Sequence, residues 1–101
     1  MVNLLGLLQS TGLPVAYHHF EEPPNPPYIV YLTDGSNNFS ADNKVYAKFN
    51  TYRVELYTTK KDIISETKVE DVLDSAEMFY ESYEVYIKSE ELYQVVYEIE
   101  I

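Results

Sequence analysis

The cluster of side chains in this sequence that most resembles a metal site lies near the N-terminus. His18 and His19 are followed closely by Glu21 and Glu22. Imidazole and carboxylate groups are common ligands of zinc in proteins. Adjacent residues of a strand point to opposite faces, however, so the two imidazoles are not expected to converge on one ion. The sequence therefore predicts no metal site.

The patterns typical of covalent catalysis and of nucleotide binding are absent from the sequence. It contains no cysteine, which leaves no thiolate nucleophile and no disulfide, and no Gly-x-Ser-x-Gly motif. It contains neither a P-loop nor a Gly-x-Gly-x-x-Gly motif. Carboxylates are abundant, but a helix or strand face covered with them is usually a solvated face. We therefore expect a protein that is not an enzyme and that holds no cofactor.

The negative charge is concentrated in the C-terminal part of the chain. Residues 1–61 contain five acids and five bases, whereas residues 62–101 contain twelve acids and two lysines, so the second segment accounts for the net charge of −10. Such a field repels nucleic acid, and no specific nucleic-acid binding is expected. The same charge is also explained by a need for solubility.

The ends and the composition of the chain also limit the classes of protein to which it could belong. No apolar run is long enough to cross a bilayer, so no membrane partner is expected. Residues 1–8 lack a basic region of the kind that begins a signal peptide. The absence of cysteine suits a reducing compartment.

The last ten residues, 92–101, show the clearest secondary-structure pattern. Apolar and polar side chains alternate, and this two-residue period predicts a strand with one face on a core. The predicted core face carries Tyr93, Val95, Tyr97, Ile99 and Ile101, and the water face carries Gln94, Glu98 and Glu100. Residues 83–88 alternate in the same way, and the polar residues 88–91 predict a four-residue hairpin loop between two strands.

The middle of the chain predicts two further strands joined by a long loop. Residues 28–33 are apolar on both faces, which predicts a strand covered on both sides, and one cover could be another subunit. Residues 34–43 are polar except for Phe39 and Ala41, and loops of this length in compact domains are usually functional or disordered. The chain then returns in a strand over residues 45–58.

Two helices are predicted. The first covers residues 3–11 and is followed by Gly12, a common residue after a helix C-terminus. The second runs to about residue 76 after Asp62, a plausible N-cap. Its predicted buried stripe is Val69, Val72, Leu73 and Ala76, and its predicted solvent side is Glu66, Glu70, Asp71 and Asp74.

The order of these elements predicts an α+β fold. Residues 13–20 could form one more short strand. The prediction is therefore a single domain, residues 1–101, in which a mostly antiparallel sheet of four to five strands packs with two helices.

Three tyrosines are predicted on outward strand faces, where a water-facing pattern would place Lys, Glu or Thr. They are Tyr31, Tyr57 and Tyr86. Packing between tyrosines of neighbouring strands would explain them. A protein–protein interface, where tyrosine is enriched, would explain them equally well.

Three segments of the chain carry a resemblance to a known family. Pro26-Pro27-Tyr28-Ile29-Val30-Tyr31, Tyr52-Arg53-Val54-Glu55-Leu56-Tyr57 and Leu92-Tyr93-Gln94-Val95-Val96-Tyr97-Glu98-Ile99 resemble segments of tail terminator proteins. These tail completion or tail-to-head joining proteins come from siphophages and prophages of Gram-positive bacteria. The similarity extends over nearly the whole chain in order and length, and none of its motifs is catalytic.

The resemblance implies a structural role in the virion. Members of the family have an α+β fold and form a ring, generally a hexamer, that caps the tail tube and presents a surface to the head connector. It thus implies three partners: further copies of this chain, the tail tube protein and the head-completion or connector protein. The implied location is the tail–head junction of a virion assembled in the host cytoplasm.

Residues in three parts of the chain would suit that role. The subunit or partner interface would involve Ile29, Tyr31, Tyr57 and Tyr86. The loop with Asp34, Phe39 and Asp42 would dock to the tail or to a neighbouring subunit. Glu98 and Glu100 would form an acidic wall of the channel, past which DNA slides without binding.

Two alternatives remain open at this stage. A head-completion or neck protein of the same assembly module would share these features. An acidic DNA mimic that inhibits a nuclease would use the same net charge, but it needs carboxylates spaced like phosphates over a continuous surface. Here tyrosines interrupt the acidic residues.

Overall fold

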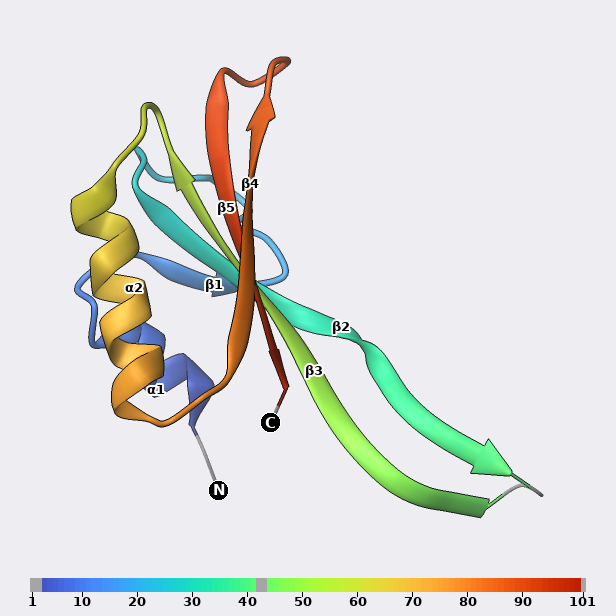
Figure 1. Ribbon diagram of the computed structural model, residues 1–101. Helices are drawn as coiled ribbons and strands as arrows, with labels where there is room; N and C mark the ends of the chain where they lie inside the picture. Colours follow the sequence, from blue (N-terminus) through green and yellow to red (C-terminus); the bar gives the residue numbers. More distant parts are fainter. Residues whose placement is uncertain (1–2, 42–43, 101) are drawn as a thin grey trace.

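The computed structural model describes residues 3–41 and 44–100, and it describes their side chains outside residues 34–50 (Figure 1). The elements follow in the order α1 (Leu4–Gln9), β1 (Val15–Tyr17), β2 (Tyr28–Ala41), β3 (Lys44–Thr58), α2 (Ile63–Ser75), β4 (Tyr80–Ile87) and β5 (Leu92–Glu100). The α+β class predicted from the sequence is confirmed, with five strands and two helices in the described residues. None of these helices is long and apolar enough to span a membrane.

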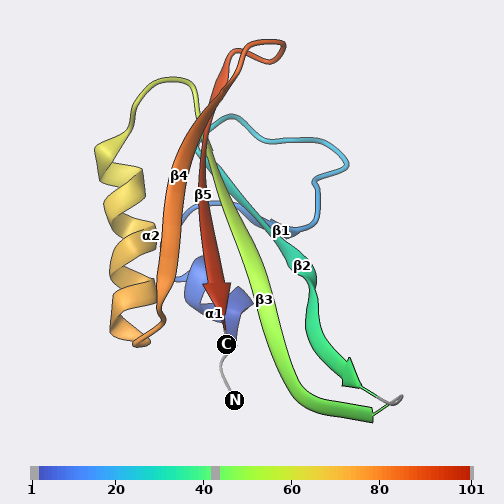
Figure 2. The same cartoon turned by 45° about the vertical axis from the view of Figure 1, so that its right-hand side comes forward.

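The strands form one sheet in the order β1-β2-β3-β5-β4, antiparallel except for the pair β1–β2. Parallel neighbours need a connection that returns the chain to the starting end of the sheet. Residues 18–27 make this connection on the side of the sheet away from α2 (Figure 2). The proline-rich residues 23–27 lie in this connection.

Both helices lie on one face of the sheet, here called the covered face (Figure 1). Its side chains are almost fully buried and form the core with Leu4 and Leu8 of α1 and Val69 and Leu73 of α2. The strands contribute Ile29, Val54, Leu56, Val95, Tyr97 and Ile99. The predicted inward sets of residues 52–56 and 93–99 are confirmed, because strand periodicity places alternate residues on this face. Ile101, also predicted on this face, lies outside the described residues.

The sequence explains where α2 begins and which side it buries. The Asp62 carboxylate accepts hydrogen bonds from the Ser65 backbone N–H at 3.0 Å and from its hydroxyl at 2.8 Å, which confirms the predicted N-cap. These bonds favour the charged carboxylate and lower the pKa of Asp62. The prediction that Glu70 faces solvent is wrong: its Oε2 accepts a 2.8 Å hydrogen bond from the hydroxyl of the fully buried Tyr97.

The loop predicted over residues 34–43 is instead part of a long hairpin. β2 continues to Ala41, and β3 starts at Lys44 and pairs with it along this length, with irregularities between Thr33 and Ser36 and between Phe39 and Ser40. Residues 34–41 and 44–50, here called the arm, extend away from the helices and the rest of the sheet (Figure 1). Backbone pairing between two adjacent chain segments forms this ribbon, although its polar composition is typical of a loop.

The hairpin of β4 and β5 has the predicted four-residue connection, residues 88–91. The register pairs Ile87 with Leu92 and therefore Tyr83 with Val96. Tyr83 and Val85 consequently lie on the face opposite the helices. The even-numbered residues of β4 share the face of Val95 and Tyr97. The two strands were predicted correctly from the sequence. Which residues of β4 lie opposite which residues of β5 is set by the length of the connecting loop.

Candidate assembly surface

The face of the sheet opposite the helices is here called the open face. Gln94 and Val96 of β5 are buried on it, so the prediction that Gln94 faces water is wrong. A loop of the same chain covers this face on its β2 side. There the connection 18–27 brings Phe20 against Tyr28, with ring centroids 5.4 Å apart. Tyr28 and Val30 are buried as a result, together with Ile29 on the covered face. The sequence prediction that this strand is covered on both sides is confirmed. The second cover is a loop of the same chain.

A polar network occupies the middle of the open face. Arg53 Nε lies 2.9 Å from Glu55 Oε2, and the Tyr57 hydroxyl donates a 2.9 Å hydrogen bond to Glu55 Oε1. Gln94 Nε2 donates to the Tyr57 hydroxyl, also at 2.9 Å. Burial and the hydrogen bond to the Glu55 carboxylate raise the pKa of Tyr57 far above its ordinary value, so the phenol stays protonated. The network joins β3 to β5 through polar side chains.

Three carboxylates follow this network towards the end of β5. Glu98 lies between Glu81 of β4 and Arg53 of β3 in the two pairings of β5, and Glu100 lies opposite Thr51 of β3. With Thr51 and Phe79 these acids line a shallow hollow of about 210 Å³. Like charges opposite each other on adjacent strands are destabilising, so Glu81, Glu98 and Glu100, here called the acidic patch, are a surface that a cationic partner would stabilise.

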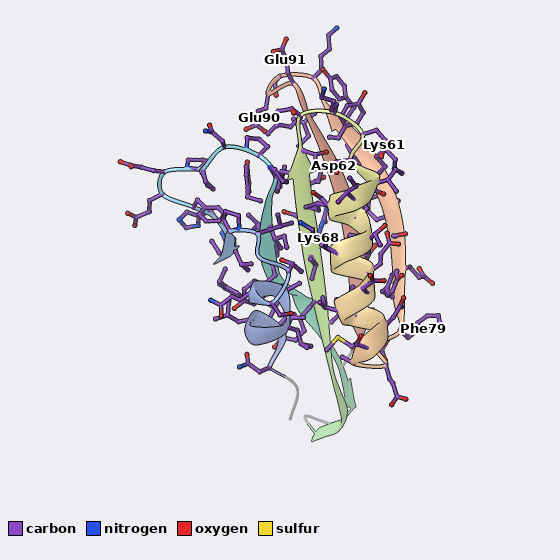
Figure 3. The ribbon with its side chains drawn as sticks, turned by 90° about the vertical axis from the view of Figure 1, so that its left-hand side faces the viewer. Lys61, Asp62, Lys68, Phe79, Glu90 and Glu91 are labelled. Carbon is purple, nitrogen blue, oxygen red and sulfur yellow. The ribbon has the colours of Figure 1, made fainter. Side chains whose placement is uncertain are left out.

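The outer strand β4 exposes apolar side chains. Tyr83, Val85 and Tyr86 keep 43%, 38% and 50% of their surface exposed, and Phe79 just before the strand keeps 78%. Figure 3 shows Phe79 at one side of the molecule, away from the body of α2. β4 ends the strand order, so one of its backbone edges faces solvent in the described structure. Exposed edge strands with apolar side chains mark sites of association with another strand.

The four predicted interface residues do not lie on one surface. Ile29 is fully buried in the core, so the prediction that it contacts a partner is wrong, because its side chain packs on the covered face. Tyr31 packs against the same core, with its ring 5.1 Å from that of Tyr17. Tyr57 belongs to the network of the open face, and Tyr86 stacks near Tyr93 on the exposed end of the β4–β5 hairpin.

The residues predicted for docking fall in the arm. Asp34 and Phe39 lie in β2 and not in a loop, and Asp42 lies outside the described residues. A docking role for this segment stays a prediction, and the segment is a pair of strands and not a loop. Glu98 and Glu100, predicted to line a channel, lie together on the open face, with Glu98 half-buried and Glu100 exposed.

The two histidines lie closer together than predicted. β1 ends at Tyr17, and His18 takes a positive φ of 70°, so the alternation of a strand does not apply to it. The Nδ1 atoms of His18 and His19 lie 3.2 Å apart at an exposed position. No group of three or more potential metal ligands occurs among the described residues.

The edge position of β4 and the exposure of Phe79 were not predicted from the sequence. The alternation of residues 83–88 was interpreted as a core-facing strand. Glutamates occur on both faces of β4, at Glu81 and Glu84, and this pattern is typical of a strand whose two faces both meet water. The glutamates on both faces could therefore have identified β4 as an edge strand from the sequence alone.

The fold is similar to that of a chain in the solved structure of the virion of a native gene transfer agent particle. The alignment has a TM-score of 0.60 and covers 93% of this chain and 82% of that chain, at 12% sequence identity. Similarity at this identity shows a shared fold. The sequence itself matches no protein-family model and no curated protein.

Proposed function

We propose that this chain is a structural protein of a phage or phage-like particle, and specifically a ring-forming tail terminator. In this role it caps the tail tube and joins the tail to the head, and it needs no catalytic residue. The observation that carries the proposal is the shared fold with a chain of a gene transfer agent virion over nearly the full length of both chains. The resemblance of three sequence segments to tail terminators supports the finer assignment.

The exposed surfaces of the chain suit a subunit of a ring. A ring needs two different contact surfaces on each copy, because each copy meets one neighbour on either side. The edge strand β4 with its exposed Tyr83 and Val85 is one such surface, and the arm at the other side of the sheet is a second. Helices on only one face leave the open face free to line a channel.

The acidic patch suits the wall of such a channel. DNA passing through a tail–head junction must not bind to the wall, and carboxylates repel phosphates. Glu98 and Glu100 lie on the open face, where they would meet the channel if the helices formed the outside of the ring. The proposed partners are thus further copies of the chain, the tail tube protein and the connector protein of the head.

Electron microscopy of lysates from the encoding phage or prophage with this gene disrupted tests the proposal. We expect DNA-filled heads beside unattached tails that are overlong or irregular at one end. Filled heads beside tails of normal length would assign the chain to head completion or to the neck instead. Intact virions in normal number would contradict a structural role, and a nuclease-inhibition assay would then test the DNA-mimic alternative.

A further inference from the structure

Among the strand edges that have no hydrogen-bonded neighbour within the described part of the chain, two are long and opposite in charge, whereas the outer strand β1 has only three residues. One is the outer edge of β4, the last strand in the order β1-β2-β3-β5-β4. The other lies in the arm: the ladder between β3 and β5 ends at the pair of Thr51 with Glu100, so residues 44–50 of β3 pair only with β2. Each edge presents backbone N–H and C=O groups that another strand can bind.

These two edges are similar in length and opposite in charge. β4 has eight residues, Tyr80–Ile87, which include Glu81 and Glu84 and no basic residue. Glu84 forms an ion pair with Lys61 at 2.9 Å, so the charge that β4 offers to a partner is mainly that of Glu81. Residues 44–50 include Lys44 and Lys48 and no acidic residue. Glu98 of β5 lies opposite Glu81 and adds to the negative charge beside β4. Complementary charge of this kind steers two surfaces together and disfavours wrong pairings.

The other free edge of the arm does not have this complementarity. Residues 32–41 of β2 extend beyond the ladder with β1, which ends at the pair of Tyr17 with Tyr31. This segment carries Asp34 and no basic residue, so it has the same sign of charge as β4. The charge pattern therefore selects β3, and not β2, as the partner strand.

We propose that residues 44–50 of one copy pair with β4 of a second copy, so that the sheet continues from one copy to the next. The contact joins two different surfaces of identical chains and therefore closes into a ring when the rotation between copies allows it. A two-stranded ribbon is at best marginally stable alone, and the pairing gives the arm a third strand. This inference rests on the proposed ring and names the strands that form its subunit contact.

Engineered cysteines test the pairing directly, because the chain contains no cysteine of its own. Ala47→Cys is mixed in turn with single cysteine variants at each position of 80–87, and the mixtures are oxidised. A disulfide needs Cβ atoms about 4 Å apart, so only a paired position forms it efficiently. Lys68→Cys on α2 is the matched control, since Lys68 is exposed on the helix, away from the sheet edges (Figure 3).

We expect a covalent dimer of Ala47→Cys with at least one β4 variant, several-fold more abundant than with Lys68→Cys. Adding Lys44→Glu and Lys48→Glu to the Ala47→Cys chain should lower the yield several-fold, and Glu81→Lys on the β4 variant should restore part of it. Light scattering on the same samples reports the oligomeric state, and circular dichroism reports whether each variant folds.

The possible failures separate this inference from the proposed function. If oligomers form but no β4 variant gives more disulfide-linked dimer than the Lys68→Cys control, the proposed strand pairing is wrong. The proposed ring would then still stand. A wild-type chain that stays monomeric both at its solubility limit and in the presence of the tail tube protein would overturn the pairing and the ring together.

Discussion

The two faces of the sheet are built from the same strands by different interactions. On the covered face, Val54 and Leu56 of β3 are fully buried against two helices. On the open face, Arg53, Glu55 and Tyr57 of the same strand form an ion pair and hydrogen bonds with part of their surface in water. Apolar burial supplies most folding free energy, whereas exposed polar pairs contribute little. The covered face therefore contributes most of the folding free energy, although Tyr28, Val30 and Val96 are buried on the open face as well.

The largest expected difference between the two faces is in the free energy of unfolding lost when a leucine on each face is replaced by alanine. Leu56→Ala removes a fully buried side chain from the covered face and should lower the free energy of unfolding by about 2–5 kcal/mol. Leu32→Ala makes the same change on the open face, where Leu32 is half-buried, and should cost less than half as much. Urea unfolding of both variants measures the two values. Equal losses would show that both faces contribute alike.

The buried tyrosine hydroxyls should differ in a similar way. Tyr97→Phe removes a fully buried donor to Glu70, at a loss of about 1–3 kcal/mol, and Tyr57→Phe should cost less because the Tyr57 side chain is only half-buried. Burial and the bond to the Glu70 carboxylate raise the pKa of Tyr97. The hydroxyl therefore stabilises the fold below about pH 10, the pKa in the unfolded chain, and this contribution is lost as the pH rises above it.

Urea unfolding between about pH 8 and about pH 11 measures this effect. The wild-type chain should lose stability over this range, and Tyr97→Phe should lose less. A wild-type and a Tyr97→Phe profile that fall in parallel would contradict the assigned role of the Tyr97 hydroxyl.

The helix that covers the core depends on its N-cap. Asp62→Ala removes the acceptor of the Ser65 bonds and should lower stability by about 1 kcal/mol. Asp71→Ala on an exposed position of the same helix is the control and should have a smaller effect. The pKa of Asp62 is lowered in the fold, so the contribution is present above about pH 4 and disappears as the pH falls through the folded value. Equal effects of the two variants at neutral pH would reject the cap.

The acidic patch should have the smallest effect on folding and a clear effect on function. Glu98→Lys with Glu100→Lys should change the free energy of unfolding by about 0.5 kcal/mol or less, because both lie on the open face. If these carboxylates line the channel, particles with the double variant should eject DNA more slowly. Unchanged ejection would place them on the outside of the ring.

The sequence predicted the elements of the covered face well, because burial against helices imposes a regular period. Residues 93–99 alternate except at Val96, and Asp62 has the side chain and position of an N-cap. The arm was missed because Asp34, Gly35 and Asn37 suggest a loop, and only the pairing of β2 with β3 makes this segment a strand. The tyrosines predicted to share an interface lie on different surfaces. Their positions depend on the order of the strands in the sheet, and the sequence does not specify that order.

Cryo-electron microscopy of the purified phage or prophage particle tests the central claim most directly. We expect a closed ring of this fold at the tail–head junction, with the helices outside, the acidic patch towards the channel and β4 beside the arm of a neighbouring copy. A purified particle that lacks the chain, or that carries it away from this junction, would contradict the proposed role.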